Sequence, residues 1–179
     1  MEAAEVPSSL IMALLGKGRV YEEVDLGIAI DANAGAVAVA SSNGVRFLES
    51  VARRDLAALY ARQSTDPAVT GEIFGELIAT YHAAGDRQNL RVTLGYVITL
   101  LNALGRHDAV LALHAALSQE DLPMSFTEAE EERLTAAVTA ASESADAATQ
   151  SRSLGRRMTM SDAVTYANSQ LDDLLSDQN

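Results

Sequence analysis

At 179 residues, the chain can form one domain with a sizeable core or a short array of helix pairs. Hydrophobic residues make up 48% of it and aromatic residues only 4%, and this Ala-, Leu- and Val-rich mixture favours closely packed helices. The net charge of −12 argues against direct nucleic-acid binding, and the absence of cysteine excludes disulfides, thiolate zinc sites and a cysteine nucleophile.

The N-terminal segment predicts one short helix over residues 8–15, with Ser8 or Ser9 as its cap and an end at Gly16-Lys17-Gly18. The first five residues lack the basic region of a signal peptide, and the apolar stretch 10–15 is too short to span a membrane. Together with the absence of cysteine, these features lead us to expect cytoplasmic residence.

Residues 25–42 are ambiguous from local pattern alone. Val24, Leu26, Ile28 and Ile30 alternate along the chain as they would in a strand. A near-repeat of 41 residues favours a helix instead, because it aligns this window with residues 66–84, where the helical pattern is clear. We therefore predict a helix over 25–42.

The same 41-residue shift aligns Asp25 with Asp66, Gly44 with Gly85 and Arg46 with Arg87, and a second shift aligns residues 68–69 with 109–110. Fixed periods of 20–50 residues are typical of stacked supersecondary units, here pairs of helices. The near-repeat lapses after Leu117.

Helix start and stop signals place the remaining elements. Asp66 followed by Pro67 begins one helix, and Gly85 and Gly105 end two helices. Thr127 and Glu130 have the spacing of a capping box. The predicted helices are residues 45–63, 66–84, 86–104, 108–118, 127–145, 147–154 and one capped by Thr159 or Ser161, with breaks at 121–123 and near 142–148.

Apolar stripes predict which faces of these helices are buried. The helix over 86–104 is apolar on two sides, so we expect it to be packed from both. The helix over 66–84 is expected to bury Val69, Ile73, Leu77, Ile78 and Tyr81.

The predicted fold class is therefore all-α, with about seven or eight helices arranged as antiparallel pairs in a short tetratricopeptide-like array. We expect an N-terminal helix and linker over 1–20, helical repeats over 21–120 and a C-terminal helical cap over 121–179.

Residues 91–117 include Leu-Leu-Asn-Ala-Leu-Gly-Arg at 100–106 and Asp-Ala-Val-Leu-Ala-Leu-His at 108–114. This run resembles the C-terminal helical-repeat region of large actinobacterial regulators, in which a STAND-class ATPase is joined to tetratricopeptide-like repeats. Many of those regulators also carry a LuxR-type DNA-binding domain or an adenylate-cyclase domain. Residues 153–167, where a Gly-Arg pair precedes a short capped helix, are similar to the segment that closes many such chains.

The resemblance covers roughly residues 45–170 and implies a tetratricopeptide-like fold and a role in signalling or transcriptional regulation. The chain lacks the family's catalytic and DNA-reading modules, so we do not transfer those activities to it.

The sequence offers no strong catalytic motif. Gly16-Lys17-Gly18-Arg19 lacks the upstream glycine and the following Ser or Thr of a phosphate-binding loop. His107 and His114 are seven positions apart, too far to share a metal ion, and the acidic residues 128–132 suit the first turn of a helix. We predict no catalytic residue, no cofactor and no metal site.

Two basic groups stand out from the acidic background and are the candidate interaction residues: Arg53, Arg54, Arg152, Arg156 and Arg157. They could face an acidic partner or pair with carboxylates of this chain, and the second alternative is the more common use of such residues.

We predict a non-enzymatic protein-interaction module of a bacterial regulator, which contacts a protein partner, the remainder of a multidomain protein or a second copy of itself. The alternative is a small-molecule sensor with a ligand between helix pairs, and a weaker third is an enzyme with an unrecognised site. An open groove with exposed apolar residues would favour the first, a pocket with convergent polar groups the second, and clustered groups of perturbed pKa the third.

Overall fold

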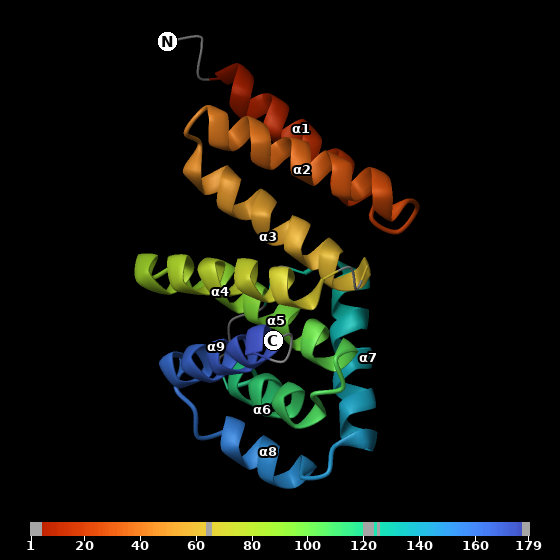
Figure 1. The fold of residues 1–179 in the computed structure, drawn as a ribbon, viewed down its shortest axis with the longest axis vertical. Coiled ribbons are helices and arrows are strands. Elements are labelled where there is room, and N and C mark those ends of the chain that lie inside the picture. The colour runs from red at the N-terminus through yellow and green to blue at the C-terminus, as the bar shows by residue number, and fades with distance from the viewer. Residues whose placement is uncertain (1–4, 64–65, 120–123, 125, 177–179) are drawn as a thin grey trace. The chain divides into compact units, whose positions relative to one another are not determined.

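The computed structural model describes residues 5–63, 66–119, 124 and 126–176, which form nine α-helices and no β-strand (Figure 1). The all-α prediction is confirmed, and the described residues hold one or two more helices than expected. In chain order the helices are α1 (Glu5–Tyr21), α2 (Leu26–Ser42), α3 (Arg46–Gln63), α4 (Pro67–Ala84), α5 (Arg87–Ala103), α6 (His107–Leu117), α7 (Glu128–Ser144), α8 (Ala148–Gly155) and α9 (Met160–Ser176).

The chain divides into two compact units. Unit 1 comprises residues 1–65 with α1 to α3, and unit 2 comprises residues 66–179 with α4 to α9. The boundary falls inside the predicted repeat segment 21–120, between the pair α2–α3 and the pair α4–α5.

The 41-residue interval is present in the helices themselves. Leu26 and Pro67 begin α2 and α4, and Arg46 and Arg87 begin α3 and α5, so equivalent helices start at that interval. Asp25 caps α2 by accepting the Ile28 N–H at 3.1 Å. The prediction of a helix over 25–42 is confirmed, because a capped helix rather than a strand occupies that window.

The prediction that Gly85 and Gly105 end helices is confirmed, and Gly44, which the 41-residue shift aligns with Gly85, has the same role. Gly44, Gly85 and Gly105 have φ values of 66°, 68° and 71°, in the left-handed region that glycine occupies without steric cost. Each follows the end of a helix.

In unit 1, α2 packs against both α1 and α3. The core contains Ile11, Ala36, Ala40 and Ala52, so three of its four fully buried side chains are methyl groups. Small side chains at these contacts let the helix backbones approach closely.

The predicted end of the first helix is wrong. The helix α1 continues through Gly16 and Gly18 to Tyr21, and Ser8 and Ser9 lie within it rather than at its cap. Gly18 is buried against α2, where an added Cβ would lie 2.2 Å from Nδ2 of Asn33. Packing of α1 on α2 therefore overrides the low helix propensity of glycine.

In unit 2, α5 and α6 are the most enclosed helices. Residues 90–98 of α5 are buried without interruption, which confirms that this helix is packed from more than one side. The helices α4, α6 and α7 pack on α5, and α6 also contacts α8 and α9. The last helix, α9, lies beside α4 as well, so the C-terminal segment returns to the first helix of the unit (Figure 1).

Local hydrogen bonds cap the starts of α7 and α9. Thr127 and Glu130 form the predicted capping box at the start of α7. Thr159 caps α9, since its Oγ1 accepts the Asp162 N–H at 3.2 Å. The predicted break near residues 142–148 is confirmed, because α7 ends at Ser144. The other predicted break, at 121–123, lies outside the described residues.

One predicted buried side chain is misplaced. Val69 is 49% exposed, whereas Leu77, Ile78 and Tyr81 of the same predicted face are buried. Val69 lies in the first turn of α4 between Ala68 and Thr70, which are both buried, so it occupies the side of that turn that packing leaves uncovered. Over the described part of the chain, no helix is both long enough and apolar enough to cross a membrane.

Candidate functional site

Unit 1 carries a groove between α1 and α3, with a volume of about 380 Å³. We call it the α1/α3 groove. It is lined by Met12, Leu15, Gly16 and Arg19 from α1 and by Phe47, Leu48, Val51 and Asp55 from α3. Five of these eight residues are large and hydrophobic, and the other three include one cation, Arg19, and one anion, Asp55.

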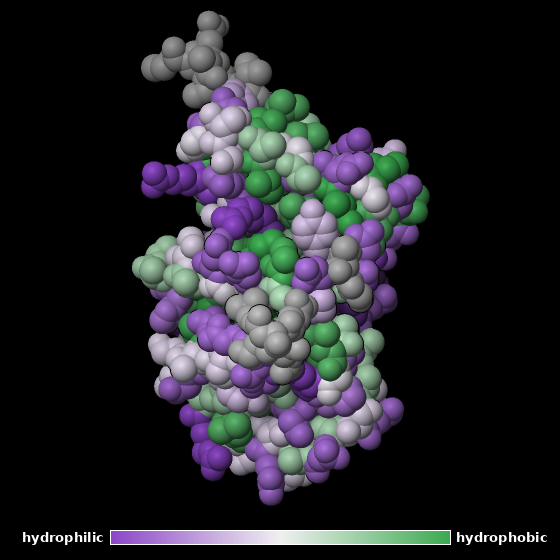
Figure 2. Space-filling view, in the orientation of Figure 1, coloured by the Kyte–Doolittle hydropathy of each residue, from purple (hydrophilic) through white to green (hydrophobic). Residues whose placement is uncertain are grey.

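The groove exposes side chains that a folded protein normally buries. Phe47 is 63% exposed and Met12 is 57% exposed. An added Cβ at Gly16 would meet no atom within 4 Å, so the space above it is open. Seven large hydrophobic side chains are exposed among the described residues, and five of them belong to unit 1: Leu10, Met12, Val20, Val24 and Phe47. Figure 2 shows hydrophobic side chains gathered over the part of the surface formed by unit 1.

The sequence pattern missed this groove although it contained a signal. Leu48 and Val51 belong to the apolar stripe of α3 and are half-buried, whereas Phe47 lies outside that stripe. A large aromatic residue on the polar side of an amphipathic helix is unusual, since burial of such a side chain is strongly favourable. Phe47 could therefore have been singled out.

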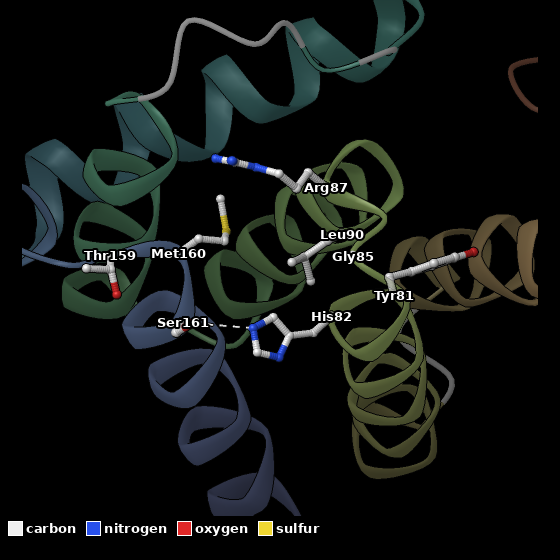
Figure 3. Close-up of a pocket in the computed structure, with 8 residues that line it drawn as sticks. All are labelled: Tyr81, His82, Gly85, Arg87, Leu90, Thr159, Met160 and Ser161. Atoms are coloured by element: carbon white, nitrogen blue, oxygen red, sulfur yellow. Dashed lines mark hydrogen bonds between the residues drawn. The ribbon is translucent and has the colours of Figure 1, made fainter.

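Unit 2 carries a second cleft, of about 510 Å³, where the end of α4, the first turn of α5 and the start of α9 meet. We call it the α4/α5/α9 cleft. It is lined by Tyr81, His82, Gly85, Arg87, Leu90, Thr159, Met160 and Ser161 (Figure 3).

Polar groups face this cleft from different elements. Nε2 of His82 on α4 and Oγ of Ser161 on α9 lie 3.4 Å apart, a hydrogen bond whose direction depends on the histidine tautomer. Figure 3 shows Arg87 on the opposite side of the space, with Leu90 and Met160 between, and Tyr81 directed away. In the part of the chain that the structure describes, no hydrogen bond joins a carboxylate to the His82 imidazole, so this His–Ser contact does not have the composition of a catalytic triad.

The predicted interaction residues lie in both units and line neither cleft. Arg54 is buried and its Nη2 lies 2.6 Å from Oδ1 of Asp55, so it forms an internal ion pair. Arg53 is half-buried beside it. The partner-binding role of these two residues stays a prediction.

The second basic group belongs to α8 and the turn after it. Arg152 donates from Nη2 to Oγ of Ser142 at 2.5 Å and thereby ties α8 to α7. Arg156 and Arg157 are exposed. Their role in binding also stays a prediction.

Within the described ranges, three groups have a displaced pKa, and none of them lines the α1/α3 groove or the α4/α5/α9 cleft. Burial, and then the charge of Arg152, lower the pKa of His114. Hydrogen bonds from the Thr159 hydroxyl and N–H lower the pKa of Asp162, and burial followed by the charge of Asp108 raises the pKa of Tyr166. Asp162 and Tyr166 belong to α9, and His114 belongs to α6.

The segment Gly16–Arg19 is helical, so it is not a phosphate-binding loop. Among the described residues, no three His, Asp or Glu side chains converge as metal ligands would.

Comparison with known proteins yields no match to this chain among protein-family models, curated proteins or solved structures. A functional assignment therefore depends on the two clefts and their chemistry.

Proposed function

We propose that this chain is a non-enzymatic protein-interaction module that binds an amphipathic helix of a partner protein in the α1/α3 groove. The observation that carries the proposal is the exposure of Phe47 and Met12, at 63% and 57%, in an open apolar groove. Contiguous exposed apolar surface with a polar rim is typical of a docking site.

The energetics favour an apolar occupant. Fully burying a Phe or Met side chain contributes roughly 1.5–3 kcal/mol, and more than half of each surface here is still exposed to water. An aromatic anchor surrounded by smaller apolar contacts is the usual arrangement of a binding hot spot. A groove between two helices accepts a third helix that presents apolar residues at positions i, i+3 or i+4, and i+7.

Charge restricts the occupant further. Arg19 lines the groove as a cation, so the partner helix should carry an acid opposite Arg19, whereas the charge of Asp55 is already paired with Arg54 at 2.6 Å. Residues 1–65 contain six basic and eight acidic residues, whereas residues 66–179 contain seven and seventeen. The strongly acidic field thus belongs to unit 2, and it argues against nucleic acid as the partner of this chain.

The tetratricopeptide-like architecture is part of this proposal. Equal 41-residue intervals between the starts of α2 and α4 and of α3 and α5 support a repeated helix pair. Likeness to the repeat region of STAND-class regulators supports a role in bacterial signalling or transcriptional control, which would place the chain in the cytoplasm.

A second candidate function is small-molecule sensing. The observation that favours it is the α4/α5/α9 cleft, where His82, Arg87 and Ser161 converge around an apolar floor. This cleft belongs to unit 2 and is independent of the groove in unit 1.

Selection from a display library tests the partner-binding proposal. A library of amphipathic helical peptides of about 18 residues, roughly five turns, is selected against the full chain. Each enriched peptide is then titrated against the wild type and against Phe47→Glu, Met12→Glu and Val24→Glu. Val24 is the matched control, because it is 78% exposed in the same unit and does not line the groove.

We expect enriched peptides with apolar residues at helical spacing, and roughly tenfold or weaker binding to both groove variants, since truncating a hot spot costs ~2 kcal/mol or more. The Val24→Glu variant should bind like the wild type. Equal binding to all four proteins, or no enrichment of amphipathic helices, would contradict the proposal.

A further inference from the structure

We propose that Thr159, in the connection between α8 and α9, is a phosphorylation site for a protein kinase whose substrate groove is acidic. The site combines an accessible hydroxyl with an exposed arginine pair, Arg156 and Arg157, just before it in the sequence. The proposal goes beyond partner binding and small-molecule sensing, and it does not depend on what occupies either cleft.

The arginine pair has a defined spacing from the hydroxyl. Arg156 and Arg157 stand three and two positions before Thr159, and no other Ser or Thr in the sequence has a basic residue at both of those positions. The other arginine pair, Arg53-Arg54, is followed at the same spacing by Leu56, which has no hydroxyl. Kinases select their substrates partly by such charge patterns, because acidic side chains beside the active site contact basic residues of the bound segment.

The local charge also favours an acidic enzyme. Residues 147–161 contain three Arg and no Asp or Glu, in a chain whose net charge is −12. An acidic substrate groove is therefore attracted to this segment and repelled by the acidic remainder of the chain. The charge pattern directs such an enzyme to Thr159.

The segment is accessible to an enzyme. The helix α8 ends at Gly155 and α9 begins at Met160, so residues 156–159 lie outside both helices, at the periphery of unit 2 in Figure 1. Thr159 and both arginines are exposed. The Thr159 hydroxyl donates to the exposed Asp162 at 2.7 Å, so fraying at the start of α9 releases it without opening the core.

The proposed reaction is phosphoryl transfer from a nucleoside triphosphate that the kinase binds. Oγ1 of Thr159 attacks the γ-phosphorus, and the new O–P bond forms as the bond from that phosphorus to the bridging oxygen breaks. The nucleoside diphosphate leaves, and the hydroxyl proton passes to the general base of the kinase. The product carries an added charge of about −1.5 to −2 at pH 7.

Phosphorylation would change the cap of α9. The hydrogen bond from the Thr159 hydroxyl is the main cause of the lowered pKa of Asp162. A phosphate ester removes this donor and places negative charge beside the carboxylate, so the pKa of Asp162 should rise. That pKa therefore reports the modification in the folded protein.

Phosphorylation of the full chain in vitro provides the test. The protein is incubated with magnesium, ATP and a purified basophilic kinase, one that selects Arg two and three positions before the acceptor, and tandem mass spectrometry locates the phosphate. Thr127 is the internal control, because it caps α7 with an acid at the same spacing, Glu130, but has no basic residue two or three positions before it. We expect phosphate on Thr159 and none on Thr127, and carboxyl NMR titration of the product should show a raised pKa for Asp162.

Variants test the recognition of the arginines. The double variant Arg156→Gln and Arg157→Gln should lower kcat/KM of the kinase for this protein roughly tenfold or more, as expected for the loss of charged hydrogen-bond partners. Arg46→Gln is the matched control, since Arg46 is exposed in unit 1, and it should be phosphorylated like the wild type. Thr159→Ser should retain the modification, and Thr159→Ala should lose it.

Each negative outcome contradicts a defined part of the proposal. Absence of phosphate at Thr159 would overturn the site itself. Equal kcat/KM for the wild type and the double arginine variant, or equal modification of Thr127 and Thr159, would overturn recognition through the arginine pair. An unchanged pKa of Asp162 in the phosphorylated protein would overturn the proposed change in the cap of α9.

Discussion

The side chain of Glu130 on α7 accepts a hydrogen bond from the hydroxyl of Tyr96 on α5. Its second carboxylate oxygen accepts the backbone N–H of Thr127 at 2.6 Å, which completes the capping box of α7. Both Tyr96 and Glu130 are buried. A single carboxylate therefore starts α7 and fastens it to the central helix of unit 2.

Removing the Tyr96 hydroxyl should destabilise unit 2, because it leaves a buried carboxylate short of one donor. We expect Tyr96→Phe to lower the free energy of unfolding by roughly 1.5–3 kcal/mol, the range for a hydrogen bond to a charged group. Chemical denaturation of Tyr96→Phe, Glu130→Gln and the double variant gives the coupling energy directly. A coupling energy near zero would show that the two side chains act independently.

Gly155 is required for the contact between α8 and α6. An added Cβ at this position would lie 2.0 Å from the carbonyl oxygen of Ala112, a backbone atom that cannot move aside alone. We expect Gly155→Ala to destabilise the protein by roughly 1–3 kcal/mol, the usual cost of overpacking.

Gly75 provides the matched control for that substitution. It lies inside α4, and a Cβ there would meet no atom within 4 Å. Gly75→Ala should therefore stabilise the protein by about 0.5–1 kcal/mol through helix propensity. Thermal unfolding of both variants checks the pair, and a similar effect of the two substitutions would refute the close contact.

His114 should make stability depend on pH. Burial and Arg152 lower its pKa in the folded state below the ordinary value of 6.5, so the unfolded chain binds a proton at a higher pH than the folded chain does. The contribution of neutral His114 to the free energy of unfolding is complete above pH 6.5. It is lost as the pH falls below that value toward the lower pKa of His114 in the folded state.

Comparison with His114→Gln isolates this contribution, because all other groups titrate equally in both proteins. We expect the difference in unfolding free energy, wild type minus variant, to decrease between about pH 7.5 and about pH 5.5. Urea titrations at the two pH values measure it. A difference that is constant or that grows on acidification would contradict the lowered pKa.

Substitution of two phenylalanines, Phe74 and Phe47, should change the stability of the protein by very different amounts. Phe74 is 0% exposed, so Phe74→Ala should cost roughly 3–5 kcal/mol through a cavity in the core of unit 2. Phe47 is 63% exposed, so Phe47→Ala should change stability by less than about 0.5 kcal/mol. Denaturation curves of both variants test the contrast, and a large loss with Phe47→Ala would assign that residue to folding rather than to binding.

The helix caps and helix ends were the features of this fold that the sequence predicted best. Asp66 before Pro67, the Thr127–Glu130 box and Gly85 each satisfy backbone groups within a few residues, so sequence spacing alone locates them. The 41-residue interval resolved the ambiguity at residues 25–42 because it carried information from a distant, clearer helix.

Features that depend on tertiary packing were not predictable in this way. Gly18 resembles a helix terminator in sequence but permits a close contact with Asn33. The return of α9 to α4 follows from long-range packing that no local pattern encodes. Both clefts combine residues from helices far apart in sequence, so His82 and Ser161 gave no joint signal before they were brought within 3.4 Å.

The most direct test of partner binding is the methionine-methyl NMR spectrum of the full chain during titration with a helical peptide selected against it. The chain has five methionines, and Met12 lies in the α1/α3 groove while Met158 and Met160 belong to unit 2. We expect the Met12 resonance to shift and saturate with the peptide while those of Met158 and Met160 stay in place. An unchanged Met12 resonance at saturating peptide would contradict the account.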